Sequence, residues 1–121
     1  MIPELDIDYT YNESDGSLLL HDVPLVNQKT GKFEHIDIGL RRLSFRQKQQ
    51  LVQFRDDEMF IYLTAQAMIY QWGDKTEVTV QELSSRSANG KVDRCEYAME
   101  VINNAVETFL PPPRISFRER Q

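Results

Sequence analysis

Apolar and polar residues alternate over the first forty positions of the chain, which is the spacing of strands with one buried face. Segments 17–26 and 32–38 are predicted to be strands, and the turn-forming stretches 12–16 and 27–31 precede them. Pro24 favours a sheet edge or a bulge at its position, because proline has no N–H for a ladder hydrogen bond. An earlier strand places four apolar side chains on one face: Leu5, Ile7, Tyr9 and Tyr11. We therefore expect a three-stranded antiparallel meander with one solvated face.

A helical spacing follows the third predicted strand. Ser44 with Gln47 has the form of a capping box, and neither glycine nor proline interrupts the chain from there to Gly73. A straight helix over 45–72 would be about 42 Å long, whereas a compact domain of this size is about 35 Å across. We therefore expect a break near 55–57, where aspartate can cap a second helix. The alternative is a continuous helix whose overhang is covered by a partner.

Residues 59–72 are apolar on nearly every side of the predicted helix. A helix of this kind must be buried on most of its surface, because little of it is suited to water. Two explanations stay open at this point. The helix is either central in the core, or part of its apolar surface is an interface with another molecule.

Two more helices are predicted in the C-terminal half. A second capping-box pattern at 79–82 opens a short helix to about residue 86, and 92–109 has the spacing of a regular amphipathic helix. Prolines at 111–113 end that helix.

The predicted fold is therefore α+β, with a small antiparallel N-terminal sheet of about three strands packed on three to four helices. Residues 1–110 are expected to form a single compact domain, and 111–121 a proline-led tail. Apolar and basic positions alternate in the tail, which leaves three arrangements open. It pairs with the acidic first strand, stays flexible, or adds to the sheet of a partner.

Composition and charge narrow the class of protein. The 121 residues include 19 acidic and 14 basic side chains, for a net charge of −5. Residues 38–55 carry five bases and no acid, whereas 1–37 carry eight acids and two bases. Overall acidity argues against general nucleic-acid binding, although the basic segment leaves room for a local contact. Without a signal-peptide pattern or a run of 18 apolar residues, the chain is expected to be cytoplasmic and to have no membrane partner.

Candidate catalytic groups are few. His21 and His35 lie in predicted strands near Asp22 and Asp37, but no motif ties a serine or cysteine nucleophile to them. The single Cys95 falls on the apolar stripe of its helix, as a structural thiol would, and excludes an internal disulfide and a multi-cysteine zinc site. No phosphate-binding glycine loop occurs. We therefore expect no enzymatic activity, no cofactor and no metal.

These features predict a small non-catalytic interaction protein: an adaptor, assembly factor or inhibitor that binds another protein or a second copy of itself. The predicted partner-binding residues come from the apolar helix, the basic segment and the tail: Phe60, Tyr62, Tyr70, Trp72, Arg41, Arg42, Arg46, Ile115 and Phe117.

The alternative is a nucleic-acid-binding regulator whose C-terminal half has the outline of a helix-turn-helix with a wing. Its contacts would come from the two basic patches: Arg41, Arg42, Arg46, Lys48, Arg114, Arg118 and Arg120. The predicted second helix, 92–109, carries four acids and one base, which disfavours insertion into the major groove.

Overall fold

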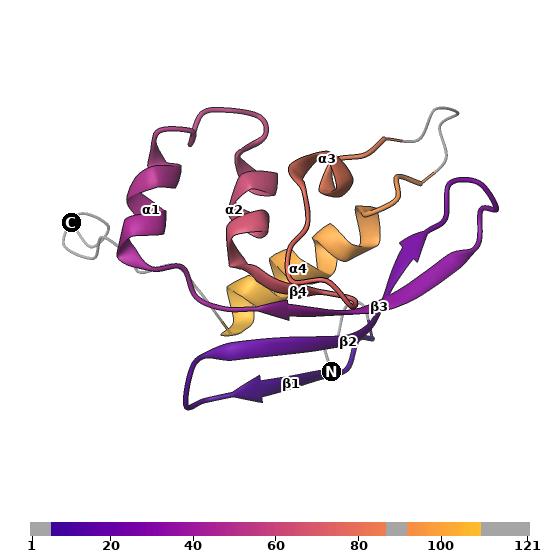
Figure 1. The fold of residues 1–121 in the computed structure, drawn as a ribbon, viewed down its shortest axis with the longest axis horizontal. Helices are drawn as coiled ribbons and strands as arrows, with labels where there is room; N and C mark the ends of the chain where they lie inside the picture. Colours follow the sequence, from indigo (N-terminus) through magenta and orange to yellow (C-terminus); the bar gives the residue numbers. More distant parts are fainter. Residues whose placement is uncertain (1–5, 87–91, 110–121) are drawn as a thin grey trace.

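The computed structural model describes residues 6–86 and 92–109 (Figure 1). An antiparallel sheet of four strands in the order β1-β2-β3-β4 is combined with four helices, so the predicted α+β class is confirmed. In chain order the elements are β1 (Tyr9–Asn12), β2 (Ser17–Val26), β3 (Phe33–Leu40), α1 (Phe45–Val52), α2 (Phe60–Met68), β4 (Ile69–Trp72), α3 (Val80–Leu83) and α4 (Glu96–Phe109). The sheet has one strand more than the sequence predicted.

The first three strands form the expected meander. Gly16, with φ +68°, closes the tight reversal between β1 and β2, and Tyr11 stands opposite Leu18 in the ladder. β2 is the best-buried strand because β1 and β3 flank it and alternate side chains point into the core. The register shifts between Leu20 and Val23, beyond which β1 no longer pairs with β2. Pro24 lies just past this irregularity, so its missing N–H costs no ladder bond to β1.

The fourth strand corrects the prediction that the long helix runs to residue 72. α2 ends at Met68, and Ile69–Trp72 pairs antiparallel with β3. Ile, Tyr and Trp favour strands, and the pairing is completed by a distant glycine. A Cβ at Gly39 would lie 2.5 Å from the ring of Tyr70, so only a glycine on β3 lets that ring lie over the strand. The helical spacing of apolar residues cannot reveal a contact between residues as far apart in the sequence as Gly39 and Tyr70.

The expected break in the long helix is confirmed. α1 ends at Val52 and α2 begins at Phe60, so no straight helix overhangs the fold. Successive i→i+3 hydrogen bonds continue from Leu51 through the connecting turn. There the Asp57 carboxylate accepts the backbone N–H of Met59 at 2.7 Å. The expected aspartate cap is wrong, because the N-cap of α2 is Met59 and no side chain makes a cap hydrogen bond there.

The two C-terminal helices are shorter than predicted. Thr79 caps α3 by accepting the backbone N–H of Glu82 at 3.1 Å, but α3 has only four residues and ends at Leu83. α4 begins at Glu96 and not at 92, and buries five residues along one face.

The core lies between α4 and the sheet, where α4 packs against β2 (Figure 1). The other three helices gather beside the β4 edge of the sheet. Tyr9 and Tyr11 of β1 pack their rings on Phe109 at the end of α4, with centroid separations of 4.6 and 5.4 Å. The largest side chains below 2% exposure come from β2, β3, α4 and the segment before it: Leu18, Leu20, Leu25, Ile38, Leu40, Ile102, Val23, Val101 and Cys95. α1 contributes no side chain to this core.

Candidate protein-interaction surface

α1 is fixed at its start by local hydrogen bonds. The Ser44 hydroxyl accepts the backbone N–H of Gln47 at 3.1 Å, and the Gln47 side chain accepts the backbone N–H of Ser44 at 2.8 Å. This reciprocal capping box satisfies two of the N–H groups that every helix start leaves without a partner. The predicted helix start at Ser44 is therefore confirmed.

Beyond its cap, α1 has little to hold it in place. None of its residues is buried, and helices this short are marginal in water on their own. Phe45 is 74% exposed and Val52 is 50% exposed. Because they are seven residues apart, the two side chains lie on the same face of the helix, two turns from each other. α1 therefore presents an apolar face to solvent.

The exposed apolar residues continue past the helix. Phe54 in the connecting turn and Ile61 on α2 are 41% and 42% exposed. Scattered single apolar residues are normal on a protein surface, but an unburied helix that carries several of them is typical of contact sites. We name these four residues, with the basic side chains of the same segment, the α1 surface: Phe45, Val52, Phe54, Ile61, Arg41, Arg42, Arg46 and Lys48.

The basic residues of the α1 surface fall into two kinds. Arg41 stacks over the ring of Tyr70, 4.6 Å from its centroid, and Arg42 donates to the carbonyl of Phe109 at 3.2 Å. Arg46 is exposed and Lys48 is half-buried. Among the described residues, no salt bridge reaches either of them. Their charges are available to another molecule.

The predicted aromatic contacts are placed differently from the expectation. Phe60, Tyr62 and Tyr70 are half-buried, so part of each ring remains accessible. Trp72 is only 7% exposed and belongs to the core cluster. The expectation that this ring is exposed is therefore wrong, because it packs inside the fold once residues 69–72 form a strand. Ile115 and Phe117 lie outside the described residues.

Sequence reasoning missed the exposed apolar residues of the α1 surface. Phe45 directly follows the cap at Ser44, and a phenylalanine there is ordinarily assigned to the core. A usable signal was the composition of α1, FRQKQQLV, which has too few apolar residues to cover a core. Phe33 on β3 is also 52% exposed, but its ring makes an edge contact with Tyr97 at 5.7 Å.

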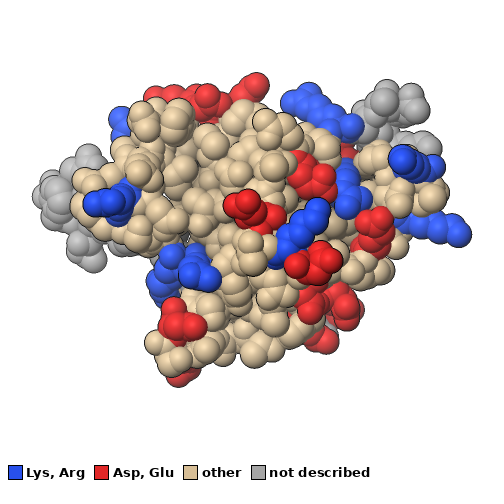
Figure 2. All heavy atoms as spheres, viewed as in Figure 1, with Lys and Arg blue, Asp and Glu red and all other residues tan. Residues whose placement is uncertain are grey.

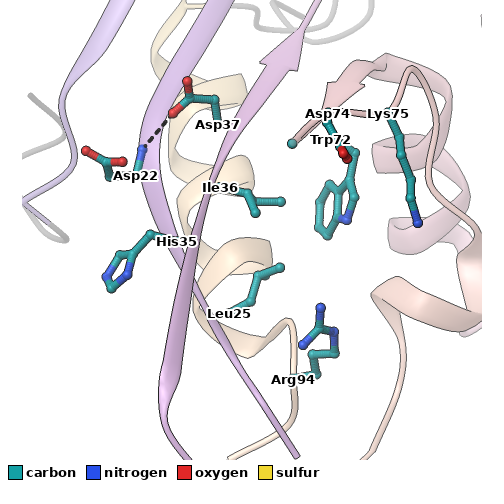
Figure 3. Close-up of a pocket in the computed structure, with 10 residues that line it drawn as sticks. Asp22, Leu25, His35, Ile36, Asp37, Trp72, Asp74, Lys75 and Arg94 are labelled. Atoms are coloured by element: carbon teal, nitrogen blue, oxygen red, sulfur yellow. Dashed lines mark hydrogen bonds between the residues drawn. The ribbon is translucent and has the colours of Figure 1, made fainter.

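A second candidate is a hollow of about 540 Å³ between β3 and the turn after β4 (Figure 3). Leu25, Ile36 and Trp72 lie on one side of β3 in this view, while His35 points to the other side. Leu25 and Trp72 are almost fully buried and expose little apolar surface to a ligand. Arg94 at the lower end is occupied by contacts within the chain.

Those contacts make Arg94 a structural residue. Its guanidinium donates to the carboxylate of Glu82 at 2.5 Å, to that of Glu34 at 3.3 Å and to the carbonyl of Val26 at 3.1 Å. The hydrogen bond to Glu82 raises the pKa of Arg94 above its ordinary value. The side chain thereby joins α3 to the β2–β3 hairpin.

His21 has both a hydroxyl and a carboxylate near its ring. Thr10 Oγ1 is 2.8 Å from His21 Nε2, but His21 Nδ1 is 4.0 Å from Asp37 Oδ1, too far for a hydrogen bond. Asp37 Oδ1 instead accepts the backbone N–H of Asp22 at 3.0 Å. The carboxylate therefore does not orient the ring as in a hydroxyl–histidine–carboxylate triad.

Cys95 is a buried thiol. It is 1% exposed, and its Sγ donates to the carbonyl of Glu82 at 3.3 Å. Burial raises its pKa to about 12, with the charge of Glu82 adding to the effect. A thiol with this pKa is protonated at neutral pH and is a poor nucleophile.

The structure describes only some of the basic residues that were predicted to bind nucleic acid. Arg41, Arg42, Arg46 and Lys48 lie on the α1 surface, whereas three further arginines lie outside the described residues: Arg114, Arg118 and Arg120. α3 is a single turn. The outward positions of α4 carry glutamates that repel phosphate: Glu96, Glu100 and Glu107.

Within residues 6–86 and 92–109, no cluster of three or more His, Cys, Asp and Glu side chains could hold a metal ion. No helix in the same ranges has the length and apolar character needed to cross a bilayer. No protein-family model, curated protein or solved structure matches the chain. Among the described residues, the α1 surface is the feature that supports a functional proposal.

Proposed function

We propose that this chain is a small non-catalytic interaction protein, acting as an adaptor, assembly factor or inhibitor, whose contact site is the α1 surface. One observation carries the proposal: α1 buries none of its residues and points Phe45, at 74% exposure, into solvent. Most helices in proteins are stabilised by packing an apolar face. In α1 the apolar face formed by Phe45 and Val52 is present, but no described part of the chain buries it.

The energetic case supports a contact of modest strength. Burying a phenylalanine and a valine contributes roughly 1.5–3 kcal/mol each before the cost of association is subtracted. Phe45 and Val52 stand on one helix face, so a single partner surface would cover both. The flanking Arg46 and Lys48 would then speed encounter with an acidic region of that partner.

Photocrosslinking in the native host tests the proposal. A photoreactive phenylalanine analogue replaces Phe45 in one variant and Phe33 in the matched control, because Phe33 is also an exposed phenylalanine but lies on β3. We expect a discrete protein adduct from position 45 and none from position 33. Adducts of equal yield from both positions, or no adduct from position 45, would refute the proposed contact site.

The second candidate function is a nucleic-acid-binding regulator, and the exposed arginines of the α1 surface are the observation that favours it. Titration with labelled DNA and RNA at low salt decides between the two. Binding through Arg41, Arg42 and Arg46 would weaken steeply as salt is raised, because each phosphate contact releases counterions. Absence of binding at low salt would eliminate this candidate.

A further inference from the structure

The charges of the α1 segment are distributed in two opposite groups. We call Arg41, Arg42, Arg46 and Lys48 the basic end, and residues 56–58 in the turn after α1 the acidic turn. The basic end has no acid within it, and the acidic turn consists of three successive acids preceded by Arg55, which leaves residues 55–58 with a net charge of −2. Figure 1 places this turn at the opposite end of α1 from the end of β3. Figure 2 shows acidic atoms along the top of this part of the molecule and basic atoms on its flank and below.

We propose that the α1 surface binds a second copy of this chain, with the two α1 helices antiparallel about a two-fold axis that crosses near Gln49. A two-fold contact brings each residue opposite its symmetry-related position. Counted from Gln49, Arg41 and Arg42 of one copy then face positions 57 and 56 in the acidic turn of the other, and this pairing occurs twice. This inference rests on the proposed function, and it names the partner that the proposed function leaves open.

The apolar residues fit the same arrangement. Phe45 and Val52 lie on either side of Gln49 on one helix face. Antiparallel packing about Gln49 therefore places Phe45 of each copy beside Val52 of the other. The polar Gln49 falls at the axis, where two amides can hydrogen-bond to each other. A parallel two-fold arrangement would instead oppose basic end to basic end and acidic turn to acidic turn.

Other occupants match this charge pattern less well. An anionic membrane surface or a nucleic acid would attract the basic end but repel the acidic turn. A uniformly acidic protein would meet the same conflict. α1 has eight residues and is too polar to lie in a bilayer interface, where amphipathic helices are longer and present a larger apolar face. A partner with the opposite polarity is needed, and a two-fold copy has it by symmetry.

The contact between the two α1 helices is short, so the dimer should be weak. An eight-residue helix is about 12 Å long, and stable interfaces bury at least about 1,000 Å² in total. We expect a dissociation constant on the order of 100 µM, stronger at low ionic strength because the paired charges are exposed.

Complementary charge reversal tests the inference on the full chain. One variant carries Arg41→Glu and Arg42→Glu, the bases that the two-fold axis sets opposite the acidic turn, and the other carries Asp56→Lys and Glu58→Lys. None of the four side chains is buried, and no salt bridge within the described residues involves them. Sedimentation equilibrium up to about 1 mM, in low salt, measures self-association of each protein, and native mass spectrometry identifies the species in their mixture.

We expect the wild type to dimerise and each variant alone to associate at least tenfold more weakly, because like charges then face each other. The equimolar mixture should form the heterodimer with roughly wild-type affinity, since both charged contacts are attractive again. Circular dichroism and the unfolding midpoint confirm that each variant is folded. The single substitutions Arg42→Glu and Asp56→Lys, at positions that face each other about Gln49, replace any double variant that has lost its fold.

Three results would overturn the inference: a wild type that stays monomeric, self-association that neither variant weakens, or a mixture that fails to recover it. The photocrosslinking experiment distinguishes failure of the self-association inference from failure of the proposed interaction function. An adduct at Phe45 with a different protein would keep the interaction function and reject the second copy as partner. An adduct of twice the chain mass would support both.

Discussion

Gly39 is the position at which a single methyl group should disturb the packing of two strands. An ideal Cβ at this residue would lie 2.5 to 2.8 Å from three ring atoms of Tyr70. Carbon atoms in contact are separated by about 3.5–4.0 Å, so in Gly39→Ala the ring must retreat by about 1 Å or rotate away. Rotation would also remove the stacking of Arg41, which lies 4.6 Å from the ring centroid.

The expected magnitude follows from two opposing effects. Overpacking of this kind costs about 1–3 kcal/mol, while replacing glycine by alanine gains about 0.4–1 kcal/mol by restricting the unfolded chain. Gly39→Ala should therefore lower the free energy of unfolding by about 1–2 kcal/mol, which shifts a urea midpoint by about 1 M. In a Tyr70→Ala background the clash is absent, and Gly39→Ala should be neutral or slightly stabilising.

Urea unfolding of the four proteins in this double-mutant cycle measures the coupling between the two positions. Gly31→Ala is the matched control, because Gly31 has open space around its Cβ position but φ +73°. Its cost comes from the backbone and should be the same in both backgrounds. An equal cost of Gly39→Ala with and without the tyrosine ring would refute the steric explanation.

Three further predictions concern the cap, the thiol and the arginine junction. Ser44→Ala removes the capping box at a local cost of about 1 kcal/mol. Because α1 buries nothing, hydrogen exchange should accelerate within α1 while the global free energy of unfolding stays constant; faster exchange throughout the core would contradict this. Because the pKa of Cys95 is raised in the folded chain, the buried thiol adds its full contribution to the free energy of unfolding below about pH 9. That contribution declines as the pH rises towards 12. Urea titrations should therefore show a smaller alkaline loss of stability in Cys95→Ala than in the wild type, and equal losses would contradict the assignment. Arg94→Ala leaves the carboxylates of Glu34 and Glu82 without their shared cation and should cost about 1–2 kcal/mol. A change in the urea midpoint too small to measure would show that the junction adds no net stability.

Local sequence signals predicted much of the fold. The alternation of apolar residues, the Asp15-Gly16 reversal and the caps at Ser44 and Thr79 all act within a few residues. The break in the long helix was also predictable from its length, because a helix longer than the domain cannot pack along its whole length on its own chain. The α+β class followed from these elements.

The fourth strand could not be predicted in the same way. Residues 69–72 continue a helical apolar pattern, and their conversion to a strand depends on Gly39, thirty positions earlier, leaving room for Tyr70. The same error made Trp72 a surface candidate, whereas the strand carries it into the core. The exposure of Phe45 was indicated only by the small number of apolar residues in α1, because the position of a helix relative to the core depends on tertiary packing.

We assign Phe45 to a contact surface and not to the core. The most direct test is one pair of measurements on Phe45→Ala: the free energy of unfolding in dilute solution, and the yield of adduct from a photoreactive residue at Val52. Because Phe45 is 74% exposed, we predict a change in unfolding free energy of at most about 0.5 kcal/mol and an adduct yield reduced at least tenfold. A loss of several kcal/mol with an unchanged adduct yield would contradict the claim.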